Sequence, residues 1–94
     1  MATQVYMRSS KLSYVELFDM VAAFIGDAPI DVDEFCDKVV LEVNEGLPES
    51  MLWYPRTSEI WIRTDDDSEI ELDEVMNMIS EAVDLVAEDY EEEA

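Results

Sequence analysis

The chain has 94 residues, of which 25 are acidic, 5 are basic and none is histidine, and its net charge is −20 at pH 7. Because phosphate binding relies on Lys and Arg, this charge excludes direct binding of a nucleic-acid backbone and disfavours an anionic membrane surface. Hydrophobic residues make up 49% of the chain, so we expect residues 1–94 to fold as a single acidic domain rather than a disordered tail.

The single cysteine and the absence of histidine limit the kinds of site that the chain can form. A single cysteine, Cys36, forbids an intrachain disulfide and favours a reducing, cytoplasmic environment. Without histidine, the usual zinc sites and histidine-based general bases are excluded, and no apolar run has the length of a membrane span. An EF-hand beginning at Asp65 fails, because Ile70 and Met76 stand where Gly and Glu are needed. We therefore expect no enzyme activity, no catalytic residue, no cofactor and no metal.

The first predicted elements are an N-terminal segment and a helix. Residues 2–7 are mildly β-prone, so the stretch 1–8 is either an edge strand or an unstructured arm. Ser13 then begins a capping box with Glu16. Apolar residues follow at helical spacing as far as Gly26, a residue suited to end a helix.

A second capping box, formed by Asp31 and Glu34, opens the next predicted helix. Cys36 falls on its apolar stripe, and we expect it to be a buried small hydrophobic residue rather than a reactive thiol. The helix is predicted to end in a Schellman-type turn at Gly46, because the nearby Pro48 cannot continue it.

Residues 51–64 change from helical to alternating character. They predict two short strands on either side of a turn at 55–57. In the second strand, Ile60 and Ile62 alternate with Trp61, so the isoleucines and the tryptophan are expected on opposite faces of a sheet.

Residues 68–72 alternate as well and are either a third strand or the first turn of the next helix. From Asp73 onward the apolar residues recur with a helical period, and 91–94 read as a frayed acidic tail. The whole pattern predicts an α+β domain in which three helices pack on a short two- or three-stranded antiparallel sheet.

The third predicted helix concentrates the charge, because residues 65–94 hold 14 acidic residues and no basic residue. Nine acids within 73–93 give about one negative charge per 3.5 Å of helix, close to the roughly 3.4 Å spacing along one DNA strand. Several recur every three or four residues and so project from one face. The candidate partner-binding acids are Asp65, Asp66, Asp67, Glu74, Glu81, Asp84, Glu88 and Asp89.

A second acidic row is available between residues 27 and 49. Two rows on one surface would resemble the two strands that border a DNA groove, and carboxylates accept bidentate hydrogen bonds from Arg as phosphates do. The row consists of Asp27, Asp31, Asp33, Glu34, Asp37, Glu42, Glu45 and Glu49. An acidic surface also serves solubility alone, or adaptation to a salty cytoplasm, so that alternative stays open.

Trp53, Tyr54 and Trp61 in the predicted hairpin offer a different kind of interface. Either they belong to the core, or they form an exposed aromatic patch of the type that anchors protein partners. Trp61 is the better surface candidate, because it alternates out of phase with its two isoleucine neighbours. Arg56 and Arg63 lie near it in the sequence, and we expect them to pair either locally with Glu59 or across a homodimer contact.

The composition, the helix order and the acidic ending resemble those of small phage-encoded DNA-mimic inhibitors, which include Ocr-like anti-restriction proteins and acidic anti-CRISPR proteins. The resemblance lies in an Asp31-capped helix that runs into Leu47 and Pro48, an aromatic segment after it, and a last helix ending in residues 88–93. It implies no particular fold and no catalytic residue. It implies that the acidic surface occupies the nucleic-acid-binding site of a host defence protein, in the host cytoplasm.

Two functional classes follow from these patterns. The first is a non-enzymatic DNA mimic whose partner is a basic nucleic-acid-binding protein of the host, such as a CRISPR effector or a restriction enzyme. The alternative is an adaptor or regulatory module that binds a protein through the Trp53/Trp61 hairpin, with acidity serving only solubility or salt adaptation. Rising salt should weaken binding steeply in the first case and hardly in the second.

Overall fold

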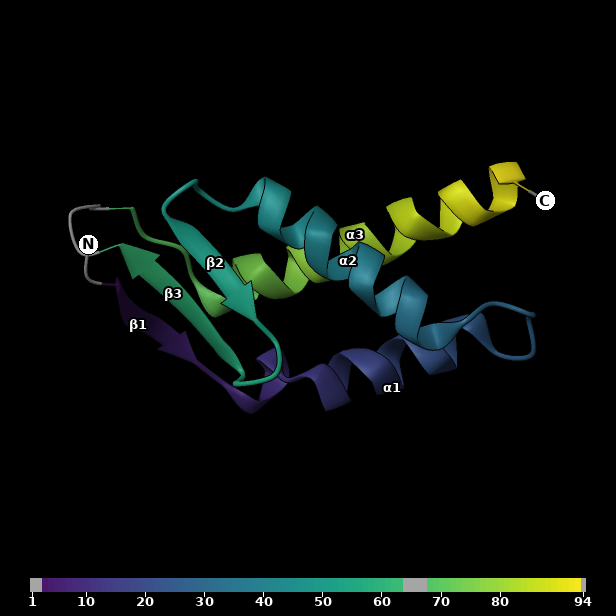
Figure 1. Ribbon diagram of the computed structural model, residues 1–94, viewed down its shortest axis with the longest axis horizontal. Helices are drawn as coiled ribbons and strands as arrows, with labels where there is room; N and C mark the ends of the chain where they lie inside the picture. The colour runs from purple at the N-terminus through teal and green to yellow at the C-terminus, as the bar shows by residue number, and fades with distance from the viewer. Residues whose placement is uncertain (1–2, 64–67, 94) are drawn as a thin grey trace.

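Three short strands form one antiparallel sheet near one end of the molecule (Figure 1). A computed structural model describes residues 3–63 and 68–93. The strands are β1 (Thr3–Arg8), β2 (Met51–Tyr54) and β3 (Glu59–Arg63), with β3 in the centre. The sheet therefore has three strands rather than two, because the N-terminal segment adds β1 at one edge. The edge-strand alternative for residues 1–8 is confirmed for residues 3–8.

Residues 68–71, the first described residues after the sheet, are neither strand nor helix, and the next helix begins at Leu72. The strand alternative for 68–72 is therefore wrong, and the helical-turn alternative holds only for Leu72. The Tyr6 side chain, rather than a neighbouring strand, hydrogen-bonds the backbone of this segment at Ile70. The Tyr6 hydroxyl accepts a hydrogen bond from the Ile70 amide at 3.0 Å and donates one to the Ile70 carbonyl at 3.2 Å. Because Tyr6 sits where the β1–β3 register shifts, it satisfies the backbone of Ile70 and allows that residue to be buried.

Both predicted helix starts are confirmed. Helix α1 (Tyr14–Ile25) follows Ser13, whose hydroxyl accepts a hydrogen bond from the Glu16 amide at 3.1 Å, and it ends at Gly26 with φ 62°. Helix α2 (Val32–Gly46) follows Asp31, whose carboxylate accepts a hydrogen bond from the Asp33 amide at 3.0 Å.

The predicted Schellman-type turn at Gly46 is wrong. Gly46 is the last helical residue of α2, its φ is not positive, and the C-cap is Leu47 with φ −76°. The glycine serves a close approach of two helices instead. A Cβ at this position would lie 2.9 Å from the Cε methyl group of Met78 on α3.

Helix α3 (Leu72–Glu93) is longer than predicted, because residues 91–93 continue it instead of fraying. Its last turns are tied to α2 by aromatic packing. The Tyr90 ring stacks on that of Phe35, with centroids 5.6 Å apart and planes 5° apart, and Lys38 Nζ lies 4.4 Å from the Tyr90 centroid. Ala94 lies outside the described residues.

Helix α2 packs against both α1 and α3 and runs in the opposite direction to them, and all three extend away from the sheet (Figure 1). A short 3-10 turn, η1 (Ser10–Leu12), leads from β1 to α1. The core lies where the helices meet one face of the sheet, and Cys36 is buried within it as expected. Its fully buried side chains are Leu12, Val21, Phe35, Cys36, Val39, Val43, Trp53, Ile60, Val75, Ile79 and Val86.

Candidate acidic interface on the third helix

Helix α3 has two faces of opposite character. Val75, Ile79 and Val86 are buried against the core, and this apolar stripe fixes the rotation of the helix. On the opposite side four acids recur at steps of three, four and seven residues, and all four are exposed. We call these residues the acidic face: Glu74, Glu81, Asp84 and Glu88.

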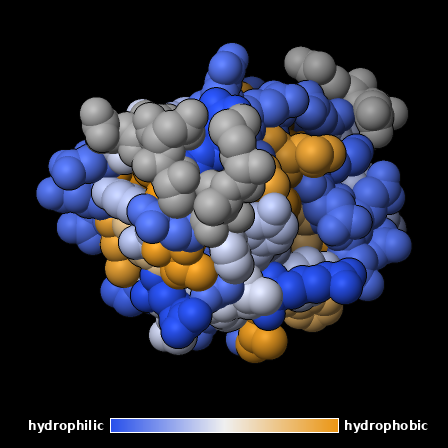
Figure 2. Space-filling view, turned by 60° about the vertical axis from the view of Figure 1, so that its left-hand side comes forward, coloured by the Kyte–Doolittle hydropathy of each residue, from blue (hydrophilic) through white to orange (hydrophobic). Residues whose placement is uncertain are grey.

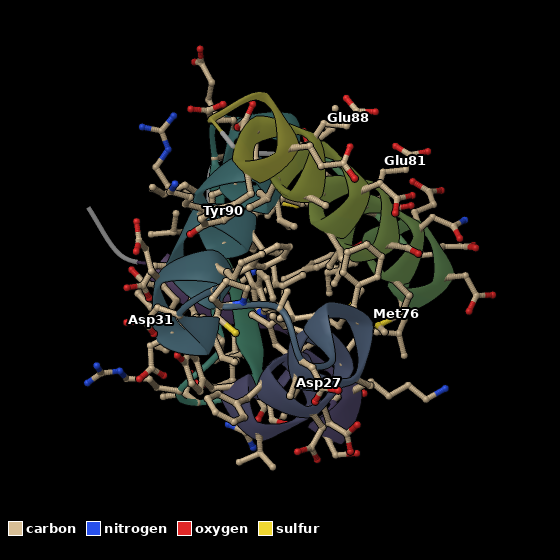
Figure 3. The ribbon with its side chains drawn as sticks, turned by 90° about the vertical axis from the view of Figure 1, so that its right-hand side faces the viewer. Asp27, Asp31, Met76, Glu81, Glu88 and Tyr90 are labelled. Carbon is tan, nitrogen blue, oxygen red and sulfur yellow. The ribbon has the colours of Figure 1, made fainter. Side chains whose placement is uncertain are left out.

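Figure 3 looks along the molecule from the helix end. Glu81 and Glu88 point away from the same side of α3, whereas the Tyr90 ring lies against α2. Asp89 is exposed as well, but it lies about 100° round the helix from Glu88 and is therefore off the acidic face. Asp65, Asp66 and Asp67 lie outside the described residues.

Helix α2 contributes two more acids beside α3. Glu42 and Glu45 of α2, together with Glu81 and Leu85 of α3, line a groove of about 440 Å³. Val43, Gly46, Met78 and Ala82 complete its lining. Acids from two helices therefore border a common groove, which is the arrangement that the second predicted row required, although only part of that row takes part.

Four acids of the predicted second row, Asp27, Asp31, Asp33 and Asp37, do not gather on this surface, so the expectation of one continuous row is wrong. Asp31 caps α2, and Asp33 accepts a hydrogen bond from the Tyr14 hydroxyl at 3.0 Å. Asp33 and Asp37 line a different groove, toward the β2–β3 turn. In Figure 3, Asp27 and Asp31 both lie away from Glu81 and Glu88. The reason is the helical period, which distributes residues 31–45 round α2.

Described basic side chains do not neutralise the acidic face. Its four carboxylates form no ion pair with any described residue; within residues 3–63 and 68–91 the ion pairs join Arg8 to Glu59 and Lys38 to Glu34. In the same ranges every acidic side chain is exposed except Glu42, which is half-buried, and Glu59, which is buried. In the same part of the chain, no cluster of acidic or cysteine side chains is arranged to hold a metal ion.

Trp53 does not belong to an interface, which corrects one of the two predicted aromatic positions. Its side chain is 2% exposed, and its indole Nε1 donates a hydrogen bond to the Leu12 carbonyl at 2.8 Å. Trp61 is half-buried on the other face of the sheet, edge-on to the Tyr54 ring at 6.0 Å. Leu52, opposite Trp61 in the register, and Tyr54 are both exposed there.

We call this uncovered side the outer sheet face, made of Val5, Leu52, Tyr54 and Trp61. On the sheet side of the molecule, hydrophobic residues reach the surface in separate patches between hydrophilic ones (Figure 2). Sequence reasoning named Tyr54 but missed Leu52. The alternation of residues 51–54 was the available signal, since burial of Met51 and Trp53 places Leu52 outside.

Comparison of the chain with protein-family models, with curated proteins and with solved structures finds no match. Its functional assignment therefore depends on its own residues. Among the described residues, no helix is both long enough and apolar enough to cross a membrane.

Proposed function

We propose that the protein is a non-enzymatic inhibitor that imitates nucleic acid. The acidic face of α3, with Glu42 and Glu45 of α2 beside it, occupies the nucleic-acid-binding site of a basic host protein such as a CRISPR effector or a restriction enzyme. The observation that carries this proposal is the row of exposed carboxylates on α3, which form no ion pair with any described residue and lie beside a groove whose other border is also acidic.

The spacing of the row supports this function. Glu74, Glu81 and Glu88 are seven residues apart, so each step is about 10.5 Å along the helix, roughly three phosphate steps of one DNA strand. Carboxylates accept bidentate hydrogen bonds from Arg side chains, as phosphates do. The high net charge adds fast, steered association that weakens as salt rises.

These carboxylates repel one another, and the cost of that repulsion indicates that the row serves a function. Like charges at i,i+4 on a helix destabilise it by a few tenths of a kcal/mol per pair. Alternating Lys residues would remove that cost while keeping the protein soluble, yet residues 65–94 contain no basic residue at all. A partner that supplies the cations accounts for this pattern.

The test is capture of the partner from host lysate, with washes of rising salt and identification by mass spectrometry. The captured protein is then assayed for binding of double-stranded DNA in competition with this chain. Replacing Glu81, Asp84 and Glu88 by Lys should abolish competition and leave the circular-dichroism spectrum unchanged. The matched control replaces Glu16, Asp19 and Asp27 by Lys, which makes the same charge change at exposed positions outside α3. Equal loss in both variants would show a general charge effect and refute a specific face.

A second function is favoured by the outer sheet face. Leu52 and Tyr54 are 42% and 44% exposed beside Trp61. An adaptor that binds a protein partner through this surface would lose binding on Trp61→Ala, and rising salt would barely change its affinity. The same lysate experiment separates the two functions, because the adaptor's partner would resist high-salt washes.

A further inference from the structure

A groove of about 1000 Å³ lies between α2 and the turn that joins β2 to β3. One wall carries Asp33 and Asp37, one helical turn apart on α2. The other carries Tyr54 and the turn that follows it. This groove is separate from the one that borders the acidic face, and it plays no part in the proposed inhibition, although Tyr54 also belongs to the outer sheet face.

The walls of the groove are held in place by the fold. The Tyr14 amide donates a hydrogen bond to the Pro55 carbonyl at 2.9 Å, which pins the turn to the start of α1. The Tyr14 hydroxyl donates to the Asp33 carboxylate at 3.0 Å, which fixes that acid on α2. Burial, and then this hydrogen bond, raise the pKa of Tyr14 to about 12, so the phenol stays a donor at neutral pH. A ligand would therefore meet a preformed groove.

The groove combines uncovered apolar surface with negative charge. Leu41 is 63% exposed although it lies on a helix of the core, and Tyr54 is 44% exposed. Asp33 and Asp37 are exposed and form no ion pair with any described residue. Tyrosine rings beside carboxylates are a favourable environment for a guanidinium or ammonium group, through cation–π attraction and charge-assisted hydrogen bonds.

We propose that this groove binds a segment of a protein partner in which an arginine or lysine is flanked by large apolar residues. The cation meets Asp33 and Asp37, and the apolar neighbours pack on Leu41 and Tyr54. Charge complementarity selects this occupant over an acidic or a purely apolar one, because the groove wall and the whole molecule are negative. Arg56 is the only cation among the residues that line the groove, and it directs the ligand's cation toward the α2 wall.

The test uses the full chain labelled with ¹⁵N and an acetylated, amidated tripeptide of leucine, arginine and leucine. Titration into the millimolar range should shift the amide signals of Asp37, Leu41 and Thr57 and leave those of α3 unmoved. The matched peptide carries citrulline in place of arginine, which has almost the same shape and no charge. It should bind about tenfold more weakly or not at all, as expected for loss of a charge-assisted contact.

Variants complete the test. Asp33→Asn with Asp37→Asn should weaken the arginine peptide about tenfold, whereas Glu16→Gln with Asp19→Asn, an equal change of charge at exposed sites on α1, should weaken it less than about twofold. Arg56→Gln should tighten binding, because it removes the cation from the groove. Shifts confined to α3, equal binding of the citrulline peptide, or no shift at all would overturn the proposal. Each of these outcomes is independent of inhibition through the acidic face.

Discussion

The Arg8 guanidinium donates a hydrogen bond from Nε to Oε2 of Glu59 at 2.9 Å, across the pair of strands β1 and β3. Glu59 is the only described acidic side chain that is buried, at 6% exposed. The pKa of this carboxyl group is lowered, first by the hydrogen bond from Arg8. In a chain of net charge −20, this buried acid is thus matched by an arginine that fastens the edge strand to the centre of the sheet.

Arg8→Ala should lower the melting temperature at neutral pH. The folded-state pKa of Glu59 lies below the ordinary value of 4.5, so the pair stabilises the fold above that pH. Its contribution is lost as pH falls through the folded-state pKa. The gap in melting temperature between wild type and variant should therefore shrink on acidification to about pH 3. Arg63→Ala, at an exposed arginine on β3, is the control and should show no such gap. A gap that persists in acid would contradict the ion-pair explanation.

Trp53→Phe should destabilise the protein more than Trp61→Phe. The first change removes the indole donor at 2.8 Å from the Leu12 carbonyl, leaves that carbonyl unpaired and opens space in the core. We expect a loss of about 2–4 kcal/mol in the free energy of unfolding. The second keeps a ring beside Tyr54 at a half-buried site and should cost less than about 1 kcal/mol. Urea unfolding at fixed salt measures both, and equal losses would be inconsistent with the different burial of the two rings.

The two glycines should respond to alanine in opposite ways. Gly26 has φ 62°, which a Cβ disfavours, so Gly26→Ala should cost about 1–2 kcal/mol. Gly46 is helical, and the atom that its new Cβ would meet is the mobile end of the Met78 side chain. Gly46→Ala should therefore be neutral or stabilise by up to about 1 kcal/mol. Chemical denaturation of both variants checks the sign, and a large loss at Gly46 would mean that Met78 has no room to move.

Neutralising the acidic face should stabilise the isolated protein. Glu81→Gln, Asp84→Asn and Glu88→Gln together remove repulsion between side chains three and four residues apart, which is worth a few tenths of a kcal/mol per pair. The gain should be largest at low ionic strength and fade at high salt, where exposed charges are screened. Thermal unfolding across a salt series provides the measurement. A variant that is less stable than wild type at low salt would show that these acids support the fold.

Cys36 should not react in the native state. Its side chain is fully buried, and burial raises the pKa of the thiol to about 11, so almost no thiolate forms at neutral pH. A maleimide reagent should modify Cys36 only at the rate at which the protein unfolds, and denaturant should accelerate the reaction sharply. Rapid labelling without denaturant would reveal local opening of α2.

Several features of the fold follow from local rules and were predictable. Ser13 and Asp31 accept hydrogen bonds from the first turns of their helices, because short polar side chains satisfy free backbone amides there. The apolar period of α3 placed Glu81 and Glu88 on its exposed side. Gly46 was misread because its close neighbour, Met78, is distant in the sequence. The burial of Trp53 and Trp61 could not be predicted either. Alternation along a strand separates its residues into two faces, but it does not say which face the helices cover.

The helix starts, the concentration of negative charge, and the residues of each helix or strand that share a face can all be read from the amino-acid order. They depend on backbone geometry and on neighbours a few residues away. Packing between distant elements is what adds residues 3–8 to the sheet and buries Trp53 in the core. It also brings Glu42 and Glu45 beside α3, while Asp33 and Asp37 face the β2–β3 turn. Those outcomes depend on packing between elements far apart in the chain, which side-chain period alone cannot specify.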